Sequence, residues 1–80
     1  MEIDLKCYSP RFREIRAGLR SSDIRPYDRD FNVGDILHFH EGENNQGVFE
    51  KTGEVESRKV ILLDQFGVQQ GYINIFMEKV

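Results

Sequence analysis

The stretch GLRSSDIRPYDRDFNVGD, residues 18–35, decides how this chain is organised, because it joins a predicted helix to a C-terminal region that is predicted to be mostly β-strand. Within it, residues 21–26 alternate in character as a short strand does. Residues 31–35 have the composition of a tight turn that leads into an apolar strand. Pro26 lacks an N–H for a sheet ladder, so we predict that the short strand lies at a sheet edge or ends there.

Upstream of this stretch, residues 2–7 alternate between apolar and charged side chains, which predicts a half-buried strand. Ser9 is the predicted N-cap of a helix, and Pro10 occupies the first helical position, where a missing N–H costs nothing. Gly18 favours an end to that helix. The basic residues that lie off its apolar stripe are Arg11, Arg13, Arg16 and Arg20.

The alternation within residues 21–26 predicts that Ile24 points into the core, while Asp23 and Arg25 share the opposite face. Downstream, turn residues divide the rest of the chain into further elements. We predict strands at 36–40, 55–64 and 72–77, loops at 41–46 and 65–71, and a hairpin turn at 51–54.

One early helix among five to six strands predicts an α+β domain that is mainly β. The same arrangement predicts that the strands close into a small β-barrel with the N-terminal helix packed on it. Short hairpin connections predict that most strand pairings are antiparallel. The chain has 80 residues, so we predict a single domain over residues 1–80.

Composition narrows the class of protein further. The single cysteine, Cys7, cannot form an internal disulfide, and no apolar run approaches the ~18 residues of a membrane span. We therefore expect a cytoplasmic protein with no membrane partner. The net charge of −3 hides an asymmetry, because residues 11–29 carry a local charge of +3 (six arginines against three acids) and residues 30–80 one of −5 (four bases against nine acids).

The words DRDF at residues 28–31 and VGD at residues 33–35 also carry a resemblance. With the segment from Gly18 to Arg25 before them, they resemble a small bacterial and phage family of unassigned function within the ASCH/PUA-like superfamily. The resemblance covers nearly the whole chain and implies a pseudo-barrel fold. Positions that depart from the family's usual Lys, Lys, Thr and Glu are Leu19, Arg20, Ser21 and Asp23.

A nucleic-acid site is the function that this segment favours, because guanidinium groups pair with phosphate oxygens. The arginines predicted to hold phosphate, in a cleft between the helix and the barrel, are Arg16, Arg20, Arg25 and Arg29. Ser21 and Asp23 would hydrogen-bond a base or sugar of RNA or another nucleic acid. The structural alternative is a solvated basic helix face, with Arg25 paired to Asp23 or Asp28.

Four aromatic side chains could offer planes on which bases stack: Tyr8, Tyr27, Phe49 and Tyr72. Tyr27 is the preferred candidate, because it lies in the basic stretch beside Pro26.

An enzyme is the alternative that the resemblance suggests, since some ASCH proteins hydrolyse the amide of acetylated cytidine with a Lys and a Thr. The resemblance puts Arg20 and Ser21 in those places, with Asp23 beside them, as the machinery of an amidohydrolase or nuclease acting on a modified nucleoside or RNA. Arginine stays protonated near neutral pH, so Arg20 could stabilise an oxyanion but could not act as a general base.

Other polar groups favour structural roles. His38 and His40 project on one face of a strand, but no third ligand is evident, so we predict no metal site and no cofactor. Asp35 is expected to accept backbone N–H bonds of the turn that Phe31 and Val33 anchor. A third hypothesis is an adaptor that binds another protein through an acidic β face, formed by Glu41, Glu43, Glu50, Glu54 and Glu56.

Overall fold

The computed structural model describes all residues, 1–80. It is mostly β, with five strands in one open sheet and one short helix. The elements are β1 (Glu2–Tyr8), α1 (Ser9–Arg16), β2 (Ser22–Pro26), β3 (Ile36–Asn45), β4 (Val48–Asp64) and β5 (Tyr72–Lys79). The strand order is β1-β3-β4-β5-β2, with β1 parallel to β3 and the other three pairings antiparallel. The predicted mainly β class is confirmed.

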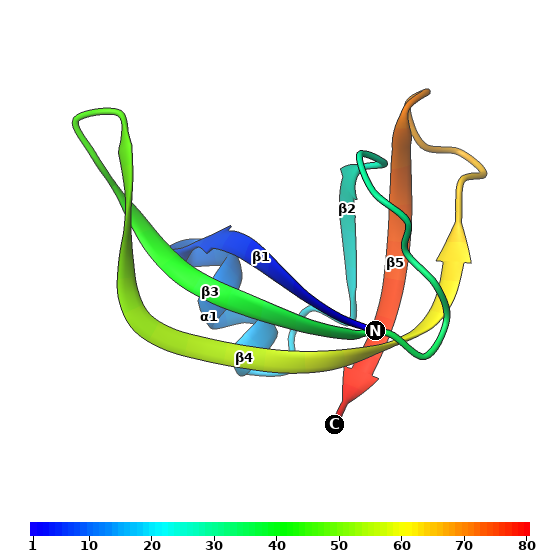
Figure 1. The fold of residues 1–80 in the computed structure, drawn as a ribbon, viewed down its shortest axis with the longest axis horizontal. Helices are drawn as coiled ribbons and strands as arrows, with labels where there is room; N and C mark the ends of the chain where they lie inside the picture. The colour runs from blue at the N-terminus through cyan, green and yellow to red at the C-terminus, as the bar shows by residue number, and fades with distance from the viewer.

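The predicted closed barrel is wrong, because β1 and β2 are the two free edges of a strongly curved sheet (Figure 1). Side chains span the gap between these edges. Arg25 Nη2 donates to the carbonyl of Lys6 at 2.6 Å, and Arg29 Nη1 donates to that of Asp4 at 3.4 Å. The guanidinium groups thus donate hydrogen bonds to β1 carbonyls that would pair with a neighbouring strand if the barrel were closed. The prediction that β2 is an edge strand is confirmed.

The orientation predicted for β2 is also wrong. Ile24 is 51% exposed, whereas Asp23 is 1% exposed and faces inward. The inward side chains of β2 are held by ion pairs, because Asp23 contacts both Arg25 from its own strand and Arg11 from α1. Alternation located the two faces of this strand correctly, but ion pairing decided which face became buried.

Helix α1 begins at Ser9, and its N-cap is Tyr8, so the prediction of a Ser9 cap is wrong by one residue. The buried Ser9 hydroxyl instead donates to the carbonyl of Gly42 in β3. The helix ends as predicted near Gly18, which adopts a φ of +77° and donates its N–H to the carbonyl of Ile15. The helix is therefore tied to the sheet at its first turn.

The hairpin of β3 and β4 is longer than predicted, because residues 41–45 of the predicted loop and the whole predicted turn at 51–54 belong to strands. The chain reverses instead at Gln46 and Gly47, which have positive φ angles of 52° and 84°. Residues 41–55 form an arm that projects from the body of the sheet (Figure 1). A bulge opposite Glu41 lets β4 bend there, with Thr52 Oγ1 donating to the Glu41 carboxylate at 2.6 Å.

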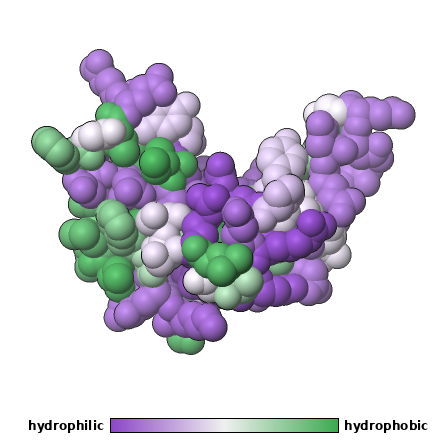
Figure 2. All heavy atoms as spheres, turned by 180° about the vertical axis from the view of Figure 1, so that it is seen from behind, coloured by the Kyte–Doolittle hydropathy of each residue, from purple (hydrophilic) through white to green (hydrophobic).

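No helix is long and apolar enough to cross a membrane. The hydrophobic core lies between the concave face of the sheet and α1. Its buried residues are Ile3, Leu5, Cys7, Phe12, Ile15, Phe31, Leu37, Phe39, Val60, Ile73, Ile75 and Met77. In the view of Figure 2 the projecting arm is mainly hydrophilic, and hydrophobic atoms gather at the opposite side of the molecule.

Candidate ligand-binding cleft

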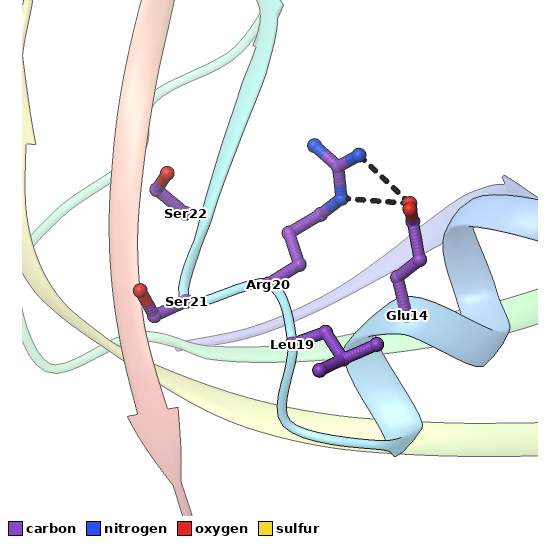
Figure 3. A pocket seen from close by; sticks show the side chains of 5 residues that line it. All are labelled: Glu14, Leu19, Arg20, Ser21 and Ser22. Atoms are coloured by element: carbon purple, nitrogen blue, oxygen red, sulfur yellow. Dashed lines mark hydrogen bonds and ion pairs between the residues drawn. The ribbon is translucent and has the colours of Figure 1, made fainter.

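An open cleft separates the C-terminal part of α1 from the start of β2 (Figure 3). It has a volume of about 340 Å³ and is lined by Glu14, Leu19, Arg20, Ser21 and Ser22. The Arg20 side chain extends across the cleft towards α1, where its Nε and Nη2 groups both donate to Glu14 Oε1, at 3.3 and 2.8 Å. This hydrogen bonding raises the pKa of Arg20, so its guanidinium remains charged.

The two serine hydroxyls lie on the other side of the β2 strand from Arg20. Figure 3 shows both Ser21 and Ser22 directed towards β5, and neither is hydrogen-bonded to Arg20. The side chain of Asp23 is in turn bonded to Arg25. The trio that the enzyme hypothesis required, Ser21 beside Arg20 and Asp23, is close in sequence but is not assembled as a hydrogen-bonded unit.

A buried charge cluster lies between α1 and β2. Asp23 Oδ2 accepts a 2.6 Å hydrogen bond from Arg25 Nε, and Asp23 Oδ1 lies 3.3 Å from Arg11 Nη1. Oδ1 is inaccessible to solvent and accepts no hydrogen bond. The Arg25 guanidinium also lies 5.6 Å from the centre of the Phe39 ring, which joins the cluster to the core. The main role of Arg25 is therefore structural.

Cys7 borders this cluster from β1. Burial raises the pKa of its thiol, and the negative charge of Asp23 raises it further. The surrounding guanidinium groups of Arg25, Arg11 and Arg20 act in the opposite direction without reversing the shift. A protonated, buried thiol is a poor nucleophile, and Cys7 instead packs in the hydrophobic core.

Five of the seven residues predicted to bind nucleic acid lie outside the cleft lining: Asp23 and Arg25 of the buried cluster, and Arg16, Tyr27 and Arg29. Arg16 donates to Glu54 and Glu56 of β4, at 2.9 and 3.0 Å. Tyr27 packs on Phe31, with ring centres 6.2 Å apart. Arg29 pairs with Asp28 and reaches the edge of β1.

The structure therefore brings only Arg20 and Ser21 of the predicted site into the cleft lining, and it pairs Asp23 with Arg25 in the buried cluster. Sequence reasoning missed two residues that matter here. Arg11 completes the buried cluster, and Arg13 is an exposed cation on α1 that takes part in no ion pair with a carboxylate. The sequence places both only on the basic helix face, because a helical pattern cannot show which strand the helix opposes.

The turn before β3 behaves largely as predicted. Asp35 Oδ2 accepts the Asn32 N–H at 2.8 Å, and Phe31 is buried, so both predictions are confirmed. Val33, the other predicted anchor, is 63% exposed, so that prediction is wrong. This turn is therefore a structural feature that fixes the start of β3.

Each of the two histidines of β3 forms a hydrogen bond with a different carboxylate of β1. His38 Nε2 lies 2.6 Å from Glu2 Oε1, and His40 Nε2 lies 2.8 Å from Asp4 Oδ1. No group of three or more ligating side chains is arranged to hold a metal ion.

The acidic side chains of the arm do not form one free surface. Glu54 and Glu56 bind Arg16, and the pKa of Glu41 is lowered mainly by its hydrogen bond with Thr52. Glu50 accepts a 2.7 Å hydrogen bond from Asn45. Much of the predicted acidic face is thus occupied by contacts within the chain.

Taken together, the fold and the cleft define a small mainly β domain whose single helix and edge strand β2 enclose a polar, arginine-containing cleft. The chain belongs to the family described as a domain of unknown function, DUF3850, whose model matches residues 3–76. A comparison with curated proteins finds no match.

Proposed function

We propose that this domain binds single-stranded RNA or another nucleic acid through the cleft between α1 and β2. We also propose that its family belongs to the ASCH/PUA-like superfamily. The observation that carries the binding proposal is the placement of Arg20 across a cleft of about 340 Å³, a size within the range of ligand pockets. The DRDF and VGD words support the superfamily assignment through their resemblance.

Arg20 is the phosphate ligand in this proposal, and Glu14 is its competitor. Glu14 holds the guanidinium while the cleft is free of ligand. A backbone phosphate that enters the cleft replaces this carboxylate and offers two oxygen atoms to the same planar donor, whereas Glu14 binds it through Oε1 alone. Arg13 is an exposed cation on the same helix, without a carboxylate ion pair, and we assign it a contact with a neighbouring phosphate. Ser21 and Ser22 offer hydroxyl groups to the sugar or base on the β5 side.

Binding is favoured over catalysis for two reasons. The raised pKa of Arg20 keeps it protonated, so it cannot accept a proton from a nucleophile. Ser21 has neither Arg20 nor Asp23 as a hydrogen-bonded base, because Asp23 is engaged by Arg25. A hydroxyl needs such a base before it becomes an effective nucleophile.

Fluorescence anisotropy with labelled single-stranded RNA, duplex RNA and DNA at low and physiological salt tests the proposal. The test variant is Arg13→Ala with Arg20→Ala, and the matched control is Lys59→Ala with Lys79→Ala, which removes the same charge from exposed residues elsewhere. We expect salt-sensitive binding by the wild type, weakened more by the test variant than by the control. Glu14→Gln should strengthen binding, because it releases Arg20.

Equal losses in the test variant and the control would show that the cleft is not the site. Absence of binding to all three nucleic acids at high micromolar concentration would reject a nucleic-acid function. Arg25 is unsuitable for this test, since its substitution would disrupt the buried cluster with Asp23.

A further inference from the structure

The face of the sheet opposite α1 carries a second group of basic and aromatic side chains, where β1 meets the arm. Exposed and buried residues alternate along β1, so Lys6 and Tyr8 lie on this outer face. The pairing of β3 sets His40 opposite Lys6 and sets Gly42 opposite Lys51 of β4. Residues far apart in the sequence thus meet on one surface.

An aromatic platform is built into this surface. The Phe49 ring lies directly against Gly42, where a Cβ atom would come within 2.1 Å of the ring, so only glycine leaves room for it. Tyr8 meets Phe49 edge-on, with ring centres 5.2 Å apart and an interplanar angle of 73°. Tyr8 is 54% exposed, so part of its ring is open to solvent.

A small hollow of about 140 Å³ adjoins the platform and is lined by Asp4, Leu5, Lys6, His40 and Lys51. Lys6 connects the two, because its Nζ atom also lies 5.5 Å from the centre of the Phe49 ring. Neither Lys6 nor Lys51 forms an ion pair with a carboxylate, whereas Arg11, Arg16, Arg20 and Arg25 do. The carboxylate in the hollow, Asp4, is engaged by His40 at 2.8 Å. Two ammonium groups are therefore available to an anion.

We propose that this surface is a second contact site for single-stranded nucleic acid, with a phosphate held between Lys6 and Lys51 and a base stacked on Tyr8. This inference rests on the function proposed above. Single-strand binders combine cationic side chains that follow the backbone with aromatic rings that stack bases, and this surface has both. Stacking on one exposed ring is tolerant of base identity, so the contact adds affinity without reading sequence.

The two sites are connected across the edge of β1. Arg25, on the same edge strand as the cleft residue Ser22, donates to the backbone carbonyl of Lys6, whose side chain lines the hollow. Lys6 lies on the outer face of β1, away from the acidic side of the arm. That side faces α1, as the contacts of Glu54 and Glu56 with Arg16 indicate.

The test compares the binding of a short fluorescein-labelled oligouridylate to three full-length variants over a range of salt concentrations. Lys6→Ala with Lys51→Ala removes the two ammonium groups, and Lys59→Ala with Lys79→Ala removes the same charge from exposed positions outside the hollow. Tyr8→Leu keeps an apolar side chain but removes the stacking plane. All the altered residues are exposed, and circular dichroism verifies that each variant folds.

We expect Lys6→Ala with Lys51→Ala to weaken binding more than the control and to lower the salt slope by about 0.7 for each phosphate that the variant no longer neutralises. Tyr8→Leu should weaken binding about fivefold or more while leaving the salt slope unchanged, since stacking releases no counterion. Equality of the lysine variant and its control, together with unchanged binding by Tyr8→Leu, would overturn the second site. If Arg13→Ala with Arg20→Ala still weakened binding, the cleft proposal would stand alone. No binding by the wild type would reject both.

Discussion

At the residue scale, Asp23 shows most clearly how charge rather than hydropathy determined the fold. A carboxylate that is 1% exposed must have partners, because an isolated charge in the protein interior costs several kcal/mol. Arg25 and Arg11 supply them from two different elements. The cluster thereby fixes β2 with its polar side inward and leaves Ile24 on the surface.

Removal of one partner should therefore be costly. We predict that Arg25→Ala lowers the free energy of unfolding by about 3–5 kcal/mol, because Asp23 keeps its buried charge and retains only the half-exposed Arg11. Arg29→Ala, which breaks an exposed pair, should change it by about 1 kcal/mol or less. Urea denaturation measures both. A loss for Arg25→Ala as small as that for Arg29→Ala would contradict the structural role of the cluster.

At the element scale, α1 is short and depends on the sheet for its position. Ser9 ties its first turn to β3, and Arg58 of β4 ties its end, since Arg58 Nη2 donates to the carbonyl of Ile15 at 2.7 Å. The same buried guanidinium donates to Glu56 and to the carbonyl of Ser57. A side chain from a distant strand thus adds a second donor to a carbonyl at the end of the helix, which also accepts the Gly18 N–H.

Arg58→Met tests this connection. We predict a loss of about 1–3 kcal/mol of unfolding free energy, because Met retains the apolar stem but removes one donor each from the Ile15 carbonyl, the Ser57 carbonyl and Glu56. The neighbouring substitution Lys59→Met, at an exposed position, should stay within about 0.5 kcal/mol of the wild type. Chemical denaturation followed by circular dichroism provides the comparison. Equal stability of the two variants would show that Arg58 does not anchor the helix.

At the scale of the whole molecule, carboxylates with lowered pKa values determine how stability varies with pH. Burial raises the pKa of Asp35, but the Asn32 N–H and the N-terminal ammonium group outweigh it, so the net shift is downward from 3.8. Burial likewise opposes ionisation of Glu56, and the hydrogen bonds from Arg16 and Arg58 lower its pKa below 4.5. A carboxyl group whose pKa is lower in the folded state favours folding above its unfolded pKa.

We therefore predict that the urea midpoint falls as the pH drops through about 4 and below, where these carboxylates become protonated. Asp35→Asn should reduce the size of this fall, because it removes one of the titrating groups. A midpoint that rises on acidification would contradict the sign of these shifts.

Local sequence patterns were sufficient to predict much of the molecule. Alternation in residues 2–7 predicted β1, helical spacing with Gly18 predicted the end of α1, and Pro26 predicted an edge strand. These features depend on neighbours within a few residues, where backbone conformation and side-chain periodicity act directly. The hairpin was harder, because Gly42 resembles a loop residue until Phe49 is seen to pack against it.

The sequence by itself determined the mainly β class, the one helix and the basic segment that follows it. Only the tertiary structure decided that the sheet stays open, that Asp23 rather than Ile24 is buried, and that Lys6 and Lys51 share a hollow. The physical reason is that strand order and ion pairing join residues far apart in the chain. The burial of a charge depends on the partners that the fold brings to it, which no local pattern specifies.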